Sequence, residues 1–174
     1  MTTSQGEELL RNGDFSEGTP GRPTSLTGVR VAGDSAAPWW TVWNNTEATT
    51  TTELVLNENS AAPGLPDHIQ MIQVTAAPRN GIVQKLPQPV PGPAVFEVMV
   101  FVLDNPPNGR AGVGLGLGGE QATTTLTTTH GKWESLQVRS LLPQVQEVTI
   151  YSTENTSFYV GDASLTNDGD EGNN

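Results

Sequence analysis

The stretch "GVGLGLGGEQATTTLTTTHGKW", residues 112–133, decides the fold class. It contains G-x-G-x-x-G at Gly114, Gly116 and Gly119, which is the spacing of a dinucleotide-binding fingerprint. That fingerprint holds phosphate only where a strand ends and a helix begins, because the phosphate lies on the N-terminal amides of the helix. Here a run of β-branched threonines follows, and such residues disfavour a helix. The stretch therefore predicts two β-strands and argues against a nucleotide-binding turn.

The first of these strands has one face without side chains. Successive side chains of a strand point to opposite faces, so Val113, Leu115 and Leu117 point one way and the glycines between them leave the other face bare. Glycine in a strand marks close approach by a ligand or by another backbone. We expect Gly114 and Gly116 to border an interior ligand cavity. The alternative is a glycine face packed tightly against a neighbouring strand or a large tryptophan.

The rest of the chain repeats short alternating runs between clusters of Gly, Pro and Asn, and no window has the apolar spacing of a helix. This pattern predicts an all-β, antiparallel, jelly-roll-like sandwich or flattened barrel with an interior ligand cavity. The expected strands are 7–12, 39–45, 50–57, 69–75, 81–86, 94–103, 111–118, 122–129, 133–140, 146–152 and 157–165.

One domain is expected over 1–165, followed by a disordered acidic tail at 166–174. Residues 13–38 are rich in Gly, Pro, Ser and Thr, and long connections of this kind are usually functional or mobile. We therefore expect an N-terminal lid within 1–38.

Composition excludes several classes of function. The 174 residues carry a net charge of -11, which repels a phosphate backbone, so no nucleic-acid partner is expected. The absence of cysteine excludes disulfides and thiolate metal sites. The longest apolar run, at 98–103, is far shorter than the roughly 20 residues that span a membrane, so no membrane partner is expected. The N-terminus lacks a basic region followed by apolar residues, which predicts a cytoplasmic protein; the alternative is that a signal peptide was removed.

Two motifs at the ends of the chain resemble a known group of proteins. "LLRNGDFSEG" at 9–18 and "FYVGDASL" at 158–165 are similar to the opening and closing strands of carbohydrate-binding modules of families 4, 9, 16 and 22, which are jelly rolls. The resemblance covers nearly the whole chain, but each motif is short. It implies a structural calcium between the first loop and the last strand, for which Asp14, Glu17 and Asp162 are the candidate ligands. The alternative is that these acids serve turns, and no other cofactor is expected.

A second resemblance concerns the size of the chain and its opening. A small β protein that begins "EELLRNGDF" and continues with a Gly/Pro-rich stretch is similar to the [4+2] cyclases of spirotetronate and spirotetramate polyketide pathways. This resemblance implies a lid that closes over a linear polyene. It transfers no catalytic residue.

The chain is poor in catalytic equipment, since His68 and His130 are in neither a zinc spacing nor a nucleophile motif. Aromatic and uncharged polar side chains are the better candidates, because stacking and hydrogen bonding can hold a ligand without a proton shuttle. The candidates for polar catalytic contacts are Gln70, Gln73, Gln84 and Glu47. The candidates for substrate binding are Trp39, Trp43, Met71, Met99, Phe101, Gly114, Gly116 and Trp133.

Two functions of different classes follow from these residues. The first is a cyclase that closes a linear polyketide tetronate or tetramate by holding it in a reactive conformation, which requires no cofactor. The alternative is a carbohydrate-binding module whose tryptophans stack on the sugar rings of an oligosaccharide. The sequence favours the cyclase, because the alternative leaves a solitary cytoplasmic module with no polymer to hold.

Overall fold

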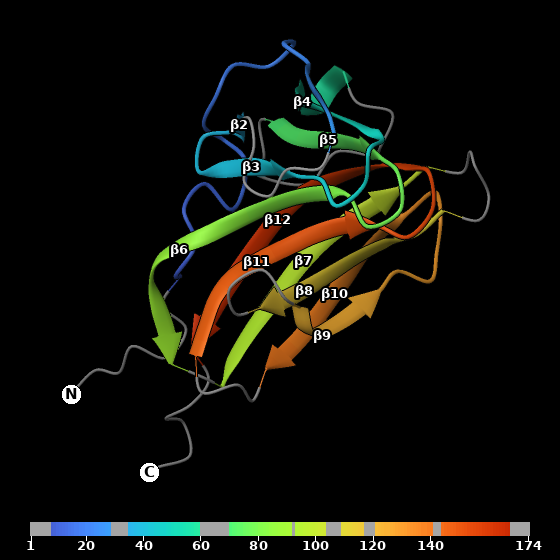
Figure 1. The fold of residues 1–174 in the computed structure, drawn as a ribbon. Helices are drawn as coiled ribbons and strands as arrows, with labels where there is room; N and C mark the ends of the chain where they lie inside the picture. Colours follow the sequence, from blue (N-terminus) through green and yellow to red (C-terminus); the bar gives the residue numbers. More distant parts are fainter. Residues whose placement is uncertain are drawn as a thin grey trace.

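The computed structural model shows a β-sandwich. It describes residues 8–28, 35–59, 70–91, 93–103, 109–116, 121–140 and 144–167. Within these ranges the chain forms two six-stranded sheets and one short 3-10 helix, η1 (Asn57–Asn59). The strands of each sheet pair antiparallel, and β6 and β11 of one sheet lie in front of β7 and β12 of the other (Figure 1). The predicted all-β, antiparallel sandwich is therefore confirmed.

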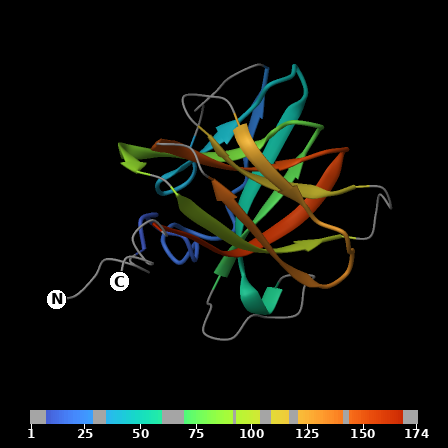
Figure 2. The same cartoon turned by 90° about the horizontal axis from the view of Figure 1, so that it is seen from below.

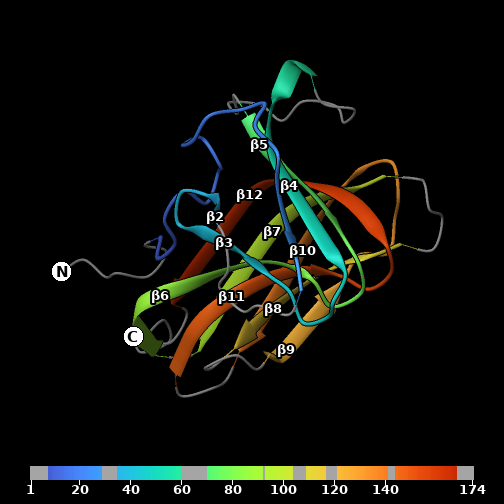
Figure 3. The same ribbon diagram turned by 45° about the horizontal axis from the view of Figure 1, so that its top comes forward.

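Most connections between the described strands cross from one sheet to the other, and three pairs of consecutive strands stay within one sheet. The first sheet has the order β1 (Thr24–Thr27), β4 (Thr49–Leu56), β5 (Gln70–Ala76), β12 (Thr156–Asn167), β7 (Ala94–Val102) and β10 (Trp133–Ser140). The second sheet has the order β2 (Ser35–Ala37), β3 (Trp40–Trp43), β6 (Gly81–Pro91), β11 (Gln144–Ser152), β8 (Ala111–Gly116) and β9 (Gln121–Leu126). Figure 3 shows β4 and β5 running across the end of the curved strands β6 and β11.

The core lies between the two sheets and is filled by alternate residues of their strands. In β7, Phe96, Val98 and Val100 are fully buried on the inner side. They pack in one cluster with inner residues of the second sheet, among them Trp40 and Ile150. The pockets that described residues line involve side chains on the outer sides or at the end of the sandwich, so the expected interior cavity is not among them.

The N-terminal segment differs from the strand expected over 7–12. Residues 8–12 form no strand, and φ is positive at Asn12 (51°) and Phe15 (57°). Instead, backbone bonds tie the segment to the end of β12, from Leu9 N to the Leu165 oxygen (2.9 Å); Figure 2 shows the dark-blue segment beside the red strand. Phe15 is fully buried against Trp40, with 5.2 Å between the ring centroids. Burying Phe15 contributes about 1.5–3 kcal/mol, so this part of the chain closes one side of the core. The lid expected within 1–38 stays a prediction.

Two strands, β1 and β2, lie within the connection expected over 13–38, where the sequence predicts no strand. Several strand ends also shift by a few residues, and two strands extend beyond their predicted ends. β6 continues to Pro91, five residues beyond the predicted end at 86. Pro87, Pro89 and Pro91 are two residues apart, so the missing N–H groups would all point to the same edge of the strand. On the edge that faces β3, pairing covers only Gly81–Val83, so β6 can carry prolines further along without losing a bond to β3. β12 extends to Asn167, and the remainder of the predicted tail lies outside the described residues.

No helix among the described residues is both long and apolar enough to cross a membrane.

Candidate functional site

The bare glycine face of β8 lies on the side of the second sheet that faces away from the core. A Cβ atom placed on Gly112 would lie 2.5 Å from Cζ of Tyr151 and 2.8 Å from Cδ2 of Leu126. Real Cβ atoms do not approach this closely, so only glycine lets the Tyr151 ring lie across the strand. At Gly112 the bare face of the strand is therefore covered by the aromatic ring of Tyr151. Of the two alternatives for this face, a ligand cavity or packing against a neighbouring group, Gly112 shows the second.

Tyr151 belongs to a small aromatic cluster on this side. Its ring meets Trp43 edge to face, with 6.2 Å between centroids and 71° between planes, and Val83 completes the cluster. Trp43 is 5% exposed. Its indole nitrogen Nε1 is buried and has no hydrogen-bond partner in the described part of the chain. A buried donor without an acceptor is uncommon and calls for an explanation.

Polar groups continue the same side of β11 beyond Tyr151. Glu147 and Thr149 have the same alternation as Tyr151, because Val148 and Ile150 point into the core. Glu147 is 1% exposed and pairs across strands with the exposed Lys85. A pocket of about 270 Å³ opens there, lined by Lys85, Leu86, Pro87, Pro89, Gln146 and Glu147. The second-sheet face is defined here as Trp43, Val83, Glu147, Thr149 and Tyr151.

The first sheet has an apolar cluster on its own outer side. Phe101 lies at the centre, edge to face with Trp133 (5.6 Å, 65°) and with Tyr159 (6.3 Å, 63°). Met71 is fully buried in the same cluster, and Val55 packs against it. The first-sheet face is defined here as Glu53, Val55, Met71, Gln73, Met99, Phe101, Trp133 and Tyr159.

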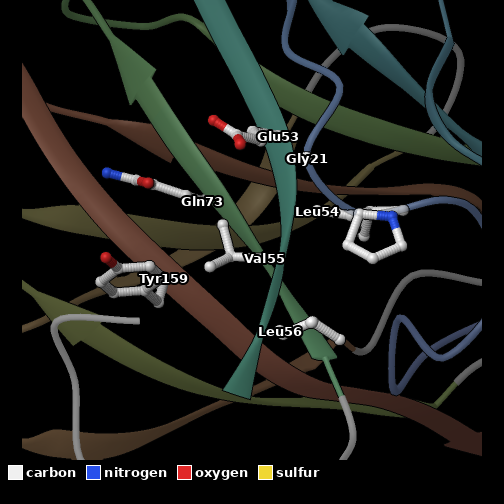
Figure 4. A pocket seen from close by; sticks show the side chains of 8 residues that line it. Gly21, Glu53, Leu54, Val55, Leu56, Gln73 and Tyr159 are labelled. Carbon is white, nitrogen blue, oxygen red and sulfur yellow. The ribbon is translucent and has the colours of Figure 1, made fainter. Parts of the chain in front are cut away.

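A second pocket opens on the first-sheet face, with a volume of about 340 Å³. In Figure 4, Glu53 projects from β4, Gln73 from β5 and Tyr159 from β12, with Val55 between them. The full lining is Pro20, Gly21, Glu53, Leu54, Val55, Leu56, Gln73 and Tyr159.

The predicted substrate-binding residues therefore divide between opposite sides of the sandwich. Met71, Met99, Phe101 and Trp133 lie on the first-sheet face, whereas Trp43 and the glycine strand lie on the outer side of the second sheet. A cavity bordered by both groups is not formed, because the packed core separates them. Gly116 pairs with Glu147 in the same ladder as Gly112.

Trp39 lies on neither face. It is 53% exposed in the turn before β3, has a positive φ of 76°, and carries the Arg11 guanidinium 4.8 Å above its ring.

The four predicted polar catalytic residues are also dispersed. Gln70 is buried and donates from Nε2 to the backbone oxygen of Phe15 (3.0 Å). Gln84 accepts from Arg11 N (3.0 Å) and donates to the Arg11 oxygen (2.9 Å). Both glutamines thus hold the N-terminal segment in place. Glu47 is exposed in the turn before β4, and Gln73 lines a pocket formed by described residues.

Of the three carboxylates proposed for calcium, that of Asp14 serves a local contact. Asp14 Oδ1 accepts from Ser16 N (3.1 Å), and the backbone N of Glu17 donates to the Asn12 side chain (2.9 Å). Asp162 lies on β12 opposite Met99. Among the described residues no three acidic or histidine side chains gather as metal ligands. Calcium takes six to eight oxygen ligands, so this set of carboxylates does not fit a calcium site.

One carboxylate outside both faces has a perturbed pKa. Burial would raise the pKa of Glu134, but hydrogen bonds from the amides and hydroxyls of Thr128 and Thr129 together hold it below its ordinary value of 4.5. These four bonds are 2.9–3.1 Å long and fix the connection from β9 to β10. His130, in the same connection, bonds the Gly109 oxygen, which agrees with a turn role; His68 lies outside the described residues.

The sequence and the structure give different results when they are compared with known proteins. No protein-family model matches the sequence, and no curated protein matches it. The structure is similar to the CBM22-1 xylan-binding domain of Paenibacillus barcinonensis Xyn10C, with a TM-score of 0.53, 14% identity and coverage of 86% of this chain and 96% of that one.

Two longer proteins share the fold in part of their length. One is the Clostridium thermocellum xylanase 10B CBM22-1–GH10 structure, complexed with xylohexaose (TM-score 0.52, 13% identity, 76% of this chain and 27% of that one). The other is the enzymatically active domain of bacteriophage CBA120 tailspike protein 4 (TM-score 0.51, 7% identity, 91% and 21%). At such low identity the likeness establishes the fold alone. The chain has the jelly-roll sandwich seen in carbohydrate-binding modules.

Proposed function

We propose that this chain binds an oligosaccharide on the second-sheet face. The observation that carries the proposal is the buried Trp43 N–H without an acceptor, held beside Tyr151 on the outer side of a sheet. An unsatisfied buried donor costs about 1–3 kcal/mol, and a ligand oxygen that reaches it would remove that cost.

The chemistry of the face suits sugar rings. Aromatic side chains pack against the apolar faces of a pyranose, and a carboxylate such as Glu147 accepts hydrogen bonds from hydroxyls. The net charge of -11 disfavours anionic ligands, which supports a neutral oligosaccharide. The likeness to xylan-binding modules supports the same ligand class through the fold.

Isothermal titration with xylohexaose and cellohexaose tests this proposal. Trp43→Phe keeps an aromatic ring but removes the N–H, so we expect affinity to fall about 3–10-fold. Trp133→Phe, on the first-sheet face, is the matched control and should bind as the wild type does. Equal affinity of Trp43→Phe and the wild type, in two folded proteins, would refute the role of this donor.

Cyclisation of a linear polyketide remains a prediction with less support. The residues predicted to border one polyketide cavity lie on opposite outer faces, and the fold matches described above include carbohydrate-binding modules. Incubation with a linear tetronate or tetramate, followed by mass spectrometry and chromatography of the product, distinguishes the two functions. A cyclised product together with no oligosaccharide binding would replace our proposal.

A further inference from the structure

The pocket on the first-sheet face has a fixed wall made by the Gly/Pro-rich stretch after Phe15. Gly18 has a φ of 106°, which side-chain-bearing residues rarely adopt, and a Cβ atom at this position would collide with Cδ1 of Leu54. Only glycine therefore lets the backbone lie this close to Leu54. Gly21 N donates to the Leu54 oxygen (2.8 Å), and Gln70 Nε2 donates to the Gly18 oxygen (3.3 Å). The stretch that the sequence suggests as a lid is thus bonded along the edge of β4.

Two hydrogen-bond acceptors point into this pocket. The Glu53 carboxylate is half-buried and makes no hydrogen bond or ion pair within the described residues. Gln73 Nε2 donates to Ser157 Oγ (3.1 Å), which in turn bonds Thr75 Oγ1 (2.9 Å), so the amide is oriented with its Oε1 atom left for a ligand. The pocket lining described above contains no basic side chain. A ligand that uses these two acceptors must bring donors to them, and an anionic ligand is disfavoured.

The remainder of the lining is apolar. Val55, Leu56 and Pro20 offer aliphatic surface. The Tyr159 ring lies on the Val55 side of β4 (Figure 4). At about 340 Å³ the pocket is at the small end of the range for ligand sites, which suits one ring better than a long chain. A ring with an apolar face and polar substituents at its edge matches both parts of the lining.

We propose that this pocket is a second sugar site, which holds a single pyranose ring by hydroxyl or ammonium donors directed to Glu53 and Gln73. It goes beyond the site proposed on the second-sheet face, because it lies on the opposite sheet and uses different residues. The chain then holds two separate glycan segments at once, one on each side of the sandwich.

Titration of the full chain, followed by amide NMR, tests the second site separately from the first. The probes are cellotriose, which has only hydroxyl donors, triglucosamine, which adds ammonium donors, and trigalacturonic acid, which is anionic. We expect cellotriose, triglucosamine or both to shift the backbone signals of Glu53 and Val55 and the side-chain amide of Gln73 in the millimolar range. Trigalacturonic acid should leave them unchanged, and shifts of these signals with it would overturn the proposal.

Matched variants identify the donors. Glu53→Gln should weaken binding at these signals about tenfold or more, because it replaces a charged acceptor by a neutral amide. Glu97→Gln, another carboxylate on the outer side of the first sheet, is the control and should change nothing. A loss for triglucosamine alone identifies an ammonium donor, and an equal loss for both sugars identifies hydroxyl donors.

Two results would overturn the second site: no shift at Glu53, Val55 and Gln73 with any probe, or equal affinity of Glu53→Gln and Glu97→Gln. The Trp43→Phe variant separates this site from the proposed function, since it should leave these shifts intact. Binding that persists at Glu53 while oligosaccharide affinity at Trp43 is absent would refute the proposed function and keep the second site.

Discussion

The two outer sides of the sandwich are built from similar residues but in opposite ways. On the second-sheet face, the Tyr151 ring is accommodated by a glycine, and both it and Trp43 are almost fully buried. On the first-sheet face, the aromatic cluster leaves Trp133 half-buried and borders an open pocket with a carboxylate in it. The first arrangement holds a buried indole N–H donor at a fixed position, and the second places half-buried acceptors beside an open pocket. The two faces would therefore meet a sugar with different polar atoms, chiefly the Trp43 donor on one side and the acceptors Glu53 and Gln73 on the other.

Removal of one tryptophan from each face gives the largest expected difference. Trp43→Ala should lower the free energy of unfolding by about 3–5 kcal/mol, because it empties a site that is 5% exposed. Trp133→Ala should cost only about 1–2 kcal/mol, because that side chain is only partly buried. Urea denaturation of both variants measures the difference. Equal losses would show that the two clusters are packed alike.

A side chain added at Gly112 should lower the stability by a smaller amount. Gly112→Val places new atoms against the Tyr151 ring, and overpacking of this kind costs about 1–3 kcal/mol. Thr41→Val, on the same side of β3, is the control and should change stability little. Thermal melts and the oligosaccharide titration together test the idea. In a double-mutant cycle, Tyr151→Ala should cost less in the Gly112→Val background than alone. An additive cycle would mean that the ring does not occupy the glycine face.

The connection between the sheets tests whether the two faces behave independently. Glu134→Gln weakens four hydrogen bonds to the Thr128–Thr129 segment and should lower Tm by about 1–3 °C at neutral pH without affecting sugar binding on either face. The folded-state pKa of Glu134 is lowered, so its stabilisation is full above pH 4.5 and is lost as the pH falls through that lower folded-state pKa. Melts of the wild type and the variant should therefore converge in acid. A constant difference at every pH would exclude the charge as its cause.

Calcium should have the smallest effect. Asp14 already accepts the Ser16 amide, and the described carboxylates form no group of three. Melts with millimolar calcium and with a chelator should give the same Tm. A rise with calcium would show a native-state metal site that these contacts do not account for.

Local patterns in the sequence predict most strands and the direction of their side chains. Alternation in 94–103 correctly separates Phe96, Val98 and Val100 from Met99 and Phe101. The same rule, applied to 146–152, places Glu147, Thr149 and Tyr151 on one side, and this signal for the second-sheet face was available but was missed.

What the sequence does not contain is the assignment of each strand to a sheet. Gly114 and Phe101 each fall on a predictable side of their own strands, but those strands join different sheets, so the two residues lie on opposite outer sides. The pocket at Glu53 depends on the same information, because β4, β5 and β12 become neighbours only through long-range pairing. The end of β6 is hard to predict for a different reason, because prolines usually end a strand. They are tolerated where their missing N–H would face an edge of the strand that pairs with no neighbour in the described part of the chain, as in β6 up to Pro91.

The position of β12 in the first sheet has a consequence for folding. The last strand of the chain lies in the middle of this sheet, between β5 and β7, and without it the sheet is two separate parts with unpaired edges. During synthesis those edges stay open until β12 has left the ribosome, and exposed strand edges promote aggregation. The pairing also joins distant parts of the chain, which slows folding. A chain truncated before Thr156 is therefore expected to be found in inclusion bodies, whatever its sugar-binding residues.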